Sequence, residues 1–471
     1  MTKAVGEREL VLEILLEVLE KGAYAHIVLR NVLSKYQYLD KRERAFITRV
    51  SVGTIERMLE LDYILDQFSK VKVRKMKPVI RNLLRSAVYQ LKYMDTVPDA
   101  AVCNEAVGLA VRKGFGNLRG FVNGVLRNVA RGLGDITYPK EELQRLSVSY
   151  SMPEWILRSW LDVYDKETVE KMLVAFQEER PLTVRCNLRK NSPEELREKL
   201  ERDGVKVERH PYLPYAFSIS GYDYLERLSC FADGDFYVQD VSSMLVGEAA
   251  RVRAGDTVID VCAAPGGKSL HLAEKLDGTG HVEARDLTPY KVELIEDNVA
   301  RAGFENIDVK VWDALVLDES AVGTADVVLA DLPCSGLGVL GKKADLKYRV
   351  TMENVEELTK LQRNILKNIG CYVKCGGTLV YSTCTISPME NIGNVRWFLE
   401  NFPEFELVDV WERLSMELAE KLREESAVER GESRDALMEK CLQLLPGVHA
   451  CDGFFIAVFV KKVLRHASVR E

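Results

Sequence analysis

Apolar residues recur every three to four positions through the first 135 residues, which is the spacing of amphipathic helices. The segments ELVLEILLEVLEKG and RNLLRSAVYQLKYM show this period, with few of the β-branched alternations that mark strands. The segment RKGFGNLRGFVNGVLRNVARGLGD closes the region with a helix that ends in glycines. The pattern predicts an all-α domain over residues 1–135.

The pattern becomes mixed over residues 136–230. RPLTVRCNLRK is typical of a strand, SPEELREKLERDG of a helix with a capping box, and VKVERHPYLPYAFSIS of strands broken by turns. We therefore expect a small α+β linker domain in this part of the chain.

Strand-like and helical segments alternate over residues 231–471, which predicts an α/β, Rossmann-like fold with a parallel sheet covered by helices on both faces. The strongest local signal is DTVIDVCAAPGGKSLHLAEKL, a buried strand followed by a loop of small residues and the start of a helix. Small residues let a ligand approach the backbone closely, and a helix N-terminus favours anionic groups. The loop is neither a P-loop nor GxGxxG, so a plain structural turn is the alternative.

Acidic residues end the strands that follow this loop. Asp286 ends HVEARD, at the place where the ribose-binding acid of a nucleotide-binding sheet belongs. Asp313 ends NIDVKVWD, and Asp331 follows ADVVLA. One strand-ending acid is common in turns, but the carboxyl ends of parallel strands meet at one crevice. Three such acids favour a ligand site.

Two cysteines fall at the same predicted edge, Cys334 in DLPCSG and Cys384 in STCT. Their positions after adjacent strands indicate covalent catalysis. Buried cysteine usually acts as a small apolar residue, and we expect that role for Cys262, Cys371 and Cys375. A zinc site built from the last two and Cys384 is a weaker alternative, because no histidine accompanies them.

Composition and charge add two expectations. No apolar run reaches the length of a membrane span and the opening residues lack a signal-peptide pattern, so we expect a cytoplasmic protein with reduced cysteines. The net charge of −7 hides an asymmetry, since residues 1–135 hold 23 Lys and Arg against 15 Asp and Glu, a balance of +8. Within them, residues 70–85 carry seven cations and no acid, which suits a phosphate backbone. The alternative is a solvated helix face.

The motifs CAAPGGK, ADLPCSGLG, YSTCT with SPMEN, and DGFFIAVF resemble those of S-adenosylmethionine-dependent RNA cytosine-C5 methyltransferases, over residues from about 231 to 465. The segment GFVNGVLRNVAR resembles the NusB-type RNA-binding helical domain. Together they are similar to the small-subunit ribosomal RNA methyltransferase B family, also called RsmB, Sun or Fmu. The resemblance implies methylation of cytosine 967 in 16S ribosomal RNA by a monomer acting on naked RNA or an early assembly intermediate.

The resemblance also implies roles for the cysteines. Carbon 5 of cytosine is a poor nucleophile until a thiolate adds at carbon 6, and Cys384 matches the family's attacking residue. Cys334 matches the residue that serves release of the product. Asp331 matches a residue that hydrogen-bonds the cytosine N3 edge, or alternatively a cofactor contact.

The cofactor implied by the resemblance is S-adenosylmethionine, and no metal is expected. Asp286 would take the ribose hydroxyls and Asp313 the adenine amino group, while the stretch GKKADLKYR, residues 341–349, offers cations and Tyr348 to RNA. We expect Lys268 to fix the loop and the neighbouring acids. The loop that would approach the amino-acid portion comprises Cys262, Ala263, Ala264, Pro265, Gly266, Gly267 and Lys268.

Three alternative functions are considered. A transfer-RNA cytosine-C5 methyltransferase would share the catalytic motifs, but such relatives generally lack the NusB-like part. A non-enzymatic NusB-type RNA-binding or antitermination factor would leave both cysteines and all three acids without a role. A NAD-linked oxidoreductase would explain the alternating sheet, but GxGxxG is missing.

Overall fold

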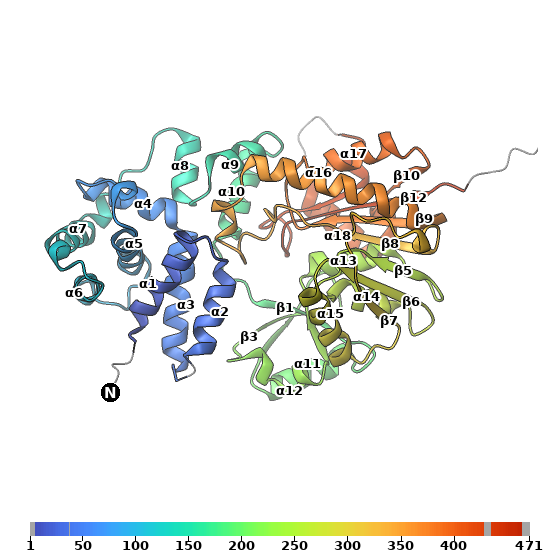
Figure 1. Ribbon diagram of the computed structural model, residues 1–471, viewed down its shortest axis with the longest axis horizontal. Helices are drawn as coiled ribbons and strands as arrows, with labels where there is room; N and C mark the ends of the chain where they lie inside the picture. The colour runs from blue at the N-terminus through green and yellow to red at the C-terminus, as the bar shows by residue number, and fades with distance from the viewer. Residues whose placement is uncertain (1–4, 37, 428–434, 464–471) are drawn as a thin grey trace, which may run out of the picture. The chain divides into compact units, whose positions relative to one another are not determined.

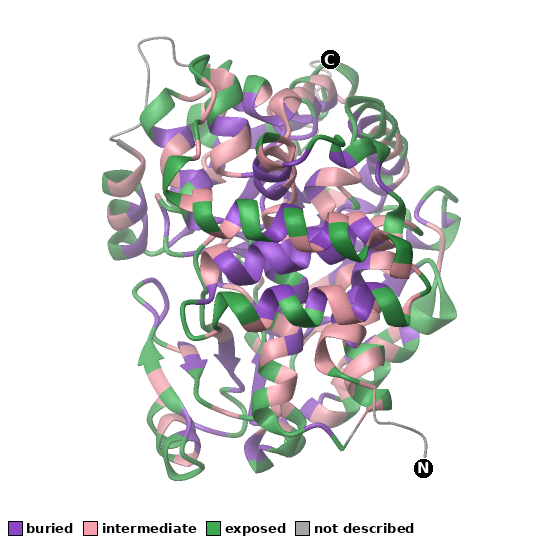
Figure 2. Ribbon diagram, turned by 90° about the vertical axis from the view of Figure 1, so that its left-hand side faces the viewer, coloured by how far each residue is buried: buried purple, intermediate pink, exposed green. Residues whose placement is uncertain are grey.

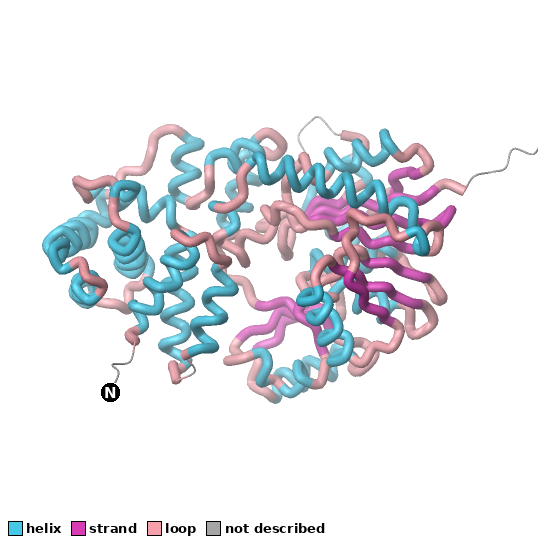
Figure 3. The backbone as a smooth tube through the Cα atoms, viewed as in Figure 1, coloured by secondary structure: helices cyan, strands magenta, loops and turns pink. Residues whose placement is uncertain are grey.

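The computed structural model describes residues 5–36, 38–427 and 435–463, and the chain divides into two compact units (Figure 1). The first unit comprises Met1–Asp162 and Leu340–Arg349, and the second comprises Val163–Val339 and Val350–Glu471. Among the described residues, every strand lies in the second unit (Figure 3). None of the described helices combines the length and the apolar character that a membrane span needs.

The first unit is helical, as the 3.6-residue period predicts. Helix α5 is buried along almost its whole length and contacts α1, α3, α4, α6 and α7. Along the helices of the protein, buried and exposed positions alternate with the helical period (Figure 2). The helices are α1 (Glu7–Leu19), α2 (Ala25–Lys35), α3 (Lys41–Glu56), α4 (Met58–Phe68), α5 (Pro78–Tyr93), α6 (Asp99–Arg112), α7 (Arg119–Gly132), α8 (Glu142–Ser149) and α9 (Glu154–Leu161).

A small antiparallel sheet opens the second unit after α10 (Lys166–Ala175). Its strand order is β2-β3-β1-β4, and α11 (Pro193–Arg202) begins at the capping box predicted by SPEE, with Ser192 and Glu195 as its two members. The predicted boundary at residue 230 falls before the last strand of this sheet, because β4 pairs with β1. The strands are β1 (Leu182–Cys186), β2 (Lys206–Arg209), β3 (Ala216–Ser220) and β4 (Phe236–Val238), with the short helix α12 (Ser229–Ala232) before β4.

The large sheet has the order β10-β12-β9-β8-β5-β6-β7, with β11 paired to β12. Strands β5 to β9 are parallel, as expected, whereas β10, β11 and β12 run antiparallel to their neighbours. The connection from β11 to β12 is a short loop without a crossover helix, which permits antiparallel pairing. The strands are β5 (Thr257–Asp260), β6 (His281–Asp286), β7 (Ile307–Val311), β8 (Ala325–Asp331), β9 (Val373–Thr383), β10 (Phe405–Val408), β11 (Leu442–Leu444) and β12 (Phe454–Lys461).

Helices cover both faces of the large sheet because its buried strands alternate between two cores. Val258 and Val380 contribute to one core, while their neighbours Ile259 and Tyr381 contribute to the other. The first core contains residues of α13 (Val241–Ala250), α14 (Gly267–Lys275), α15 (Pro289–Ala302) and α18 (Met416–Ala427). The second contains residues of α16 (Met352–Ile369) and α17 (Ile392–Asn401). This is the doubly covered α/β architecture that the alternating pattern predicts.

Candidate active site

The parallel strands β5 to β9 bring the predicted site residues to one edge of the large sheet. Each strand contributes from its carboxyl end. These contributions are the 262–268 loop after β5, Asp286 at the end of β6, Asp313 after β7, Asp331 at the end of β8 and Cys384 after β9.

The loop after β5 is tied to the end of β6. The backbone N–H of Ala264 donates to Asp286 Oδ2 at 3.0 Å, and Asp286 Oδ1 accepts from the N–H of Leu287 at 2.8 Å. Gly266 has a φ of +101°, a conformation that a side chain rarely adopts, and it begins α14 without a side-chain cap. The first turn of α14 therefore presents N–H groups without a capping side chain, which is how a helix N-terminus binds an anion.

Lys268 lies among acids, as the sequence analysis expects. Its Nζ is 2.7 Å from Asp331 Oδ2, and Asp331 Oδ1 accepts from Ser382 Oγ at 2.9 Å. Burial lowers the pKa of Lys268, but the charges of Asp331, Asp260 and Cys384 raise it, and the net shift is upward. Lys268 is therefore a cation at neutral pH and holds the end of β8 against the loop after β5.

Asp260, the last residue of β5, is a buried carboxylate at the same edge that the sequence reasoning missed. It is buried, and burial raises its pKa to about 7. Its Oδ2 accepts from Ser269 Oγ at 2.6 Å, whereas no side-chain or backbone group of the described residues satisfies Oδ1 by hydrogen-bond geometry. The sequence carried a signal, because Asp260 ends a strand at the same edge as the three acids that were identified.

These residues fit S-adenosylmethionine by their chemistry. A carboxylate suits the N-terminus of α14, and Asp286, only 3% exposed, has the place of the ribose-binding acid. The acceptor Oδ1 of Asp260 suits a donor such as an ammonium or a bridging water. Asp313 lies at the same edge, where its Oδ1 accepts from the N–H of Leu315 at 2.9 Å.

The two cysteines are in contact, with 3.4 Å between the sulfur atoms of Cys334 and Cys384. The segment after Cys334 is held by backbone bonds: the N–H of Gly338 donates to Cys384 O at 3.0 Å, and the N–H of Gly453 donates to Gly338 O at 2.9 Å. A Cβ at Gly338 would lie 2.0 Å from Gly453 O, so only glycine fits there. These bonds tie the segment after Cys334 to Cys384 and to the residue before β12.

The environments of the two thiols differ. The pKa of Cys334 lies far above its usual range. The largest cause is the hydrogen bond with Cys384, followed by burial and then by the charges of Cys384 and Glu390. On the other side, the Lys268 cation interacts electrostatically with Cys384. The hydrogen bond and burial therefore favour the thiol form of Cys334, and the charge of Lys268 favours a thiolate at Cys384.

Of the three cysteines expected to be buried apolar residues, only one fits that expectation. Burial raises the pKa of Cys262, which fits the predicted apolar role, but Cys371 and Cys375 are exposed. They lie in the turn before β9 and at its beginning, outside the core, so the apolar interpretation was wrong for this pair. Among the described residues no group of three or more potential ligands could hold a metal ion, which leaves the zinc alternative without support.

Within residues 341–349, Lys342 and Lys343 are exposed, whereas Lys347 and Tyr348 are used inside the first unit. Lys347 is 4% exposed, and its Nζ donates to Glu56 O at 2.9 Å within the first unit. The Tyr348 hydroxyl lies 3.0 Å from Glu56 O and 3.2 Å from Ser151 O, which share its single hydrogen. The backbone carbonyls of α3 and of the turn after α8 use these groups, so the expectation was wrong for Lys347 and Tyr348.

The basic stretch 70–85 is only partly used inside the first unit. Arg81 pairs with Glu20, and Arg85 Nη2 lies 2.6 Å from Asp62 Oδ2. The exposed cations of the stretch are Lys70, Lys72, Arg74, Lys75 and Lys77.

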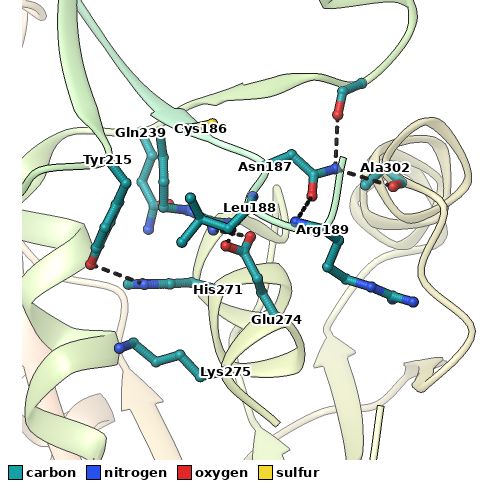
Figure 4. Close-up of polar contacts among 12 residues, drawn as sticks. Cys186, Asn187, Leu188, Arg189, Tyr215, Gln239, His271, Glu274, Lys275 and Ala302 are labelled. Carbon is teal, nitrogen blue, oxygen red and sulfur yellow. Dashed lines mark hydrogen bonds and ion pairs between the residues drawn. The ribbon is translucent and has the colours of Figure 1, made fainter. Parts of the chain in front are cut away.

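A buried polar cluster joins the small sheet to the helices of the large one within the second unit (Figure 4). Arg185 of β1 is fully buried, pairs with Glu274 Oε2 on α14 at 2.6 Å and donates to Gln239 Oε1 at 2.8 Å. Asn187 Nδ2 donates to Ala302 O at the end of α15 at 3.3 Å. The cluster joins the small sheet to α14 and α15, and no periodicity along the chain predicts it.

Comparisons with known proteins agree with this architecture. Residues 249–460 match the family described as 16S rRNA methyltransferase RsmB/F. Residues 6–131 match the NusB family, and residues 152–222 match the ferredoxin-like domain of RsmF/B-like methyltransferases. The predicted fold, a NusB-like helical domain, a small α+β domain and a Rossmann-like methyltransferase domain, is confirmed.

Relatives match along the whole chain. A probable ribosomal RNA small subunit methyltransferase B from Bacillus subtilis is 35% identical over 464 residues, which cover 98% of this chain and 100% of that protein. A ribosomal RNA small subunit methyltransferase B from Cronobacter sakazakii is 27% identical, with coverage of 98% and 100%.

Solved structures show the same arrangement of elements. The crystal structure of PH0851 has a TM-score of 0.79 and 26% identity, covering 98% of this chain and 99% of that one. A methyltransferase homolog from Pyrococcus horikoshii has a TM-score of 0.56 and 26% identity, with coverage of 68% and 98%. The chain belongs to the 16S rRNA methyltransferase RsmB/F family and is an S-adenosylmethionine-dependent RNA methyltransferase.

Proposed function

We propose that this enzyme methylates carbon 5 of cytosine 967 in 16S ribosomal RNA through a covalent bond between Cys384 and carbon 6 of the base. The observation that carries the proposal is the pair of sulfur atoms 3.4 Å apart, at the sheet edge that also holds the cofactor loop. The names of the relatives support small-subunit ribosomal RNA as the substrate. We further propose that it acts in the cytoplasm as a monomer, on naked RNA or an early assembly intermediate.

The chemistry explains the need for a thiolate. The aromatic character of cytosine keeps electron density from localising at carbon 5, and addition of the Cys384 thiolate at carbon 6 makes carbon 5 enamine-like. S-adenosylmethionine, when bound, supplies the methyl group on an electrophilic sulfonium. The 262–268 loop, Asp286 and Asp313 would hold that cofactor, and Asp331 would face the N3 edge of the base while Lys268 fixes its carboxylate.

The contact between the thiols accounts for two successive roles of Cys334. Before addition, the raised pKa of Cys334 keeps its proton in place, so we expect its S–H to point to Cys384 and to support the thiolate there. Once Cys384 is bonded to carbon 6, its sulfur carries no negative charge and accepts a hydrogen bond less strongly, so two of the causes that raise the pKa of Cys334 weaken. Cys334 can then lose its proton to solvent and act as the base that removes the proton from carbon 5.

A covalent-trapping experiment tests the proposal. In the full-length protein, Cys334→Ala should accumulate a denaturation-resistant protein–RNA band that requires S-adenosylmethionine, because addition occurs and release fails. Cys384→Ala and the double variant should give no band. A band with Cys384→Ala alone would reverse the two roles, and the absence of a band in both single variants, each folded and able to bind RNA, would refute the covalent route.

Ligand binding and RNA mapping test the cofactor and the target. S-adenosylhomocysteine at 100 times its dissociation constant should stabilise the protein by about 2.7 kcal/mol, whereas NAD should not. Ribosomal RNA from cells that lack this protein should lose 5-methylcytosine at position 967. Loss of the mark in a transfer RNA, with ribosomal RNA unchanged, would point to the other substrate class.

A further inference from the structure

A buried carboxylate lies behind the two cysteines and has no part in the chemistry described so far. Glu390, between β9 and α17, is completely buried. Its Oε1 accepts from the backbone N–H of Ser335 at 2.8 Å, and its Oε2 accepts from Ser335 Oγ at 2.5 Å. Ser335 directly follows Cys334, so Glu390 binds the backbone and the side chain of the residue next to that thiol.

The same contact reaches the other cysteine through one more residue. Ser335 Oγ is 2.7 Å from Thr385 Oγ1, and Thr385 directly follows Cys384. The neighbours of both cysteines are therefore joined in one hydrogen-bonded chain that ends on Glu390.

Helix α16 completes the network from the other side. Gln362 Nε2 donates to Glu390 Oε1 at 3.0 Å and to Pro333 O, one residue before Cys334, at 2.9 Å. The Gln362 side chain is oriented in turn by Asn394 of α17, whose Nδ2 donates to Gln362 Oε1 at 2.7 Å. Burial raises the pKa of Glu390, and its hydrogen bonds to Ser335 and Gln362 oppose that shift. The donors of Ser335 and Gln362 satisfy both carboxylate oxygens of Glu390. Each of these donors would lose its acceptor if the carboxylate were removed.

We propose that Glu390 is a positioning residue that holds the Cys334 segment against the Cys384 segment for the release step. The inference rests on the proposed function, since it assigns Glu390 to the second of the two cysteine steps. Glu390 acts through Ser335, Thr385 and Gln362, and it sets the distance between the two sulfur atoms.

The release step shows why this distance matters. The Cys334 thiolate takes the proton from carbon 5, and the electron pair of that C–H bond forms the double bond between carbons 5 and 6. The bond between carbon 6 and the Cys384 sulfur breaks, and its electron pair returns to Cys384 as a thiolate. Addition requires only Cys384, whereas release requires the sulfur of Cys334 beside the same carbon pair. A displaced Cys334 should therefore impair release while addition continues.

The test compares Glu390→Gln with Cys334→Ala in the full-length protein, using S-adenosylmethionine and a fragment of 16S ribosomal RNA that contains the target cytosine. The glutamine keeps the size of the side chain but places an amide N–H₂ against donors of Ser335 or Gln362. We expect multiple turnover to fall by roughly 10²-fold and the covalent band to accumulate, as in Cys334→Ala. The rate of band formation in a single turnover should stay close to that of the wild type. Glu390→Gln combined with Cys384→Ala should give no band.

A matched control separates positioning from loss of stability. Thr359 of α16 is also buried, but its hydroxyl donates to Val355 O within the same helix and does not touch the network. Thr359→Val should turn over normally and trap no RNA. If Glu390→Gln does not fold, Ser335→Ala removes the hydroxyl that links Glu390 to Thr385 and should give the same trapped band.

The outcomes distinguish this inference from the proposed function. A band with Cys334→Ala but none with Glu390→Gln or Ser335→Ala overturns the role of Glu390 and leaves the covalent mechanism intact. Equal slowing of band formation and turnover in Glu390→Gln also overturns it, because a general loss of structure would affect both steps. Absence of a band in every variant refutes the covalent mechanism, and the inference with it.

Discussion

Two basic stretches of this chain look alike in sequence but place individual cations in different surroundings. Residues 70–85 and residues 341–349 both concentrate cations, and both are expected to contact RNA. In the first, five cations are exposed between α4 and the first turns of α5. In the second, Lys342 and Lys343 are exposed but Lys347 is buried in the helical unit.

The difference lies in what surrounds each cation and not in the number of charges. Asp345 Oδ2 accepts from the N–H of Ala25 in the first turn of α2, and Arg349 lies over the ring of Tyr24 at 4.0 Å. Lys347 uses a helix-end carbonyl as its acceptor. The acid and the aromatic residue of the 341–349 stretch also make contacts inside the protein, which helps to hold the stretch against the helices. A run of cations without such residues is more often a solvated surface.

The largest expected effect comes from neutralising the exposed stretch. Replacing Lys70, Arg74, Lys75 and Lys77 by Gln should weaken RNA binding by roughly 10²-fold at low salt, because each phosphate contact releases counterions. The slope of log K against log salt should become shallower by up to about 3. Filter binding over a range of salt concentrations measures both quantities.

A control with the same change in charge tests the location. Neutralising four exposed cations elsewhere in the first unit should affect the salt slope much less than neutralising the stretch. The control set is Lys35, Lys41, Arg42 and Lys140. Equal slopes for the two variants would show that net charge alone, and not the 70–85 surface, governs RNA binding.

The burial of Lys347 should make the free energy of unfolding depend on pH. Burial lowers the pKa of Lys347 to about 7, with the charge of Glu56 opposing and that of Arg57 adding to the shift, whereas an unfolded lysine titrates near 10.4. Between about pH 7 and pH 10 the unfolded chain therefore binds more protons, so the contribution of this residue to the free energy of unfolding rises with pH. The rise is up to about 1.4 kcal/mol per pH unit.

Lys347→Met should remove this pH-dependent contribution while filling the same space. The measurement is urea unfolding of wild type and variant at several values from about pH 7 to pH 9. The difference in unfolding free energy between the two proteins should change with pH in favour of the wild type. A constant difference would mean that Lys347 is accessible to water, and the contrast with the exposed stretch would weaken.

Tyr348→Phe should have a smaller effect on the same unit. The hydroxyl shares its hydrogen between two backbone carbonyls, Glu56 O and Ser151 O, so its loss should lower the free energy of unfolding by about 1–2 kcal/mol. RNA affinity should stay that of the wild type, because the hydroxyl is used inside the first unit. A lower RNA affinity with unchanged stability would return Tyr348 to the RNA-facing role expected from sequence.

Sequence reasoning predicted the features that depend on local pattern. The helical period of residues 1–135, the strand–loop–helix around CAAPGGK and the strand-end positions of Asp286 and Asp331 all follow from spacing along the chain. Parallel order then places those positions at one edge, so the approach of Lys268 to Asp331 could be expected from the sequence alone.

Features that depend on tertiary partners could not be predicted in the same way. The burial of Lys347 requires a carbonyl that lies 291 residues earlier in the chain. The ion pair of Arg185 with Glu274 and the hydrogen bonds that reach Glu390 similarly join residues that no periodicity relates. Polar side chains buried by such contacts look like surface residues in the sequence, because their partners and not their neighbours compensate the cost of burial.

The smallest expected effect concerns the stability of the variant in which Lys70, Arg74, Lys75 and Lys77 are neutralised. These side chains are exposed, and surface substitutions away from caps, cores and ion-pair networks usually change stability by no more than about 0.5 kcal/mol each. Its free energy of unfolding should therefore stay near that of the wild type while its RNA affinity falls. Arg85→Gln, in the same stretch, provides the contrast. Arg85 lies on α5, which is almost fully buried, and its replacement leaves Asp62 of α4 without this partner. Unfolding by urea compares the variants. A loss of stability in the four-cation variant as large as that in Arg85→Gln would make the whole 70–85 stretch structural, as Lys347 is.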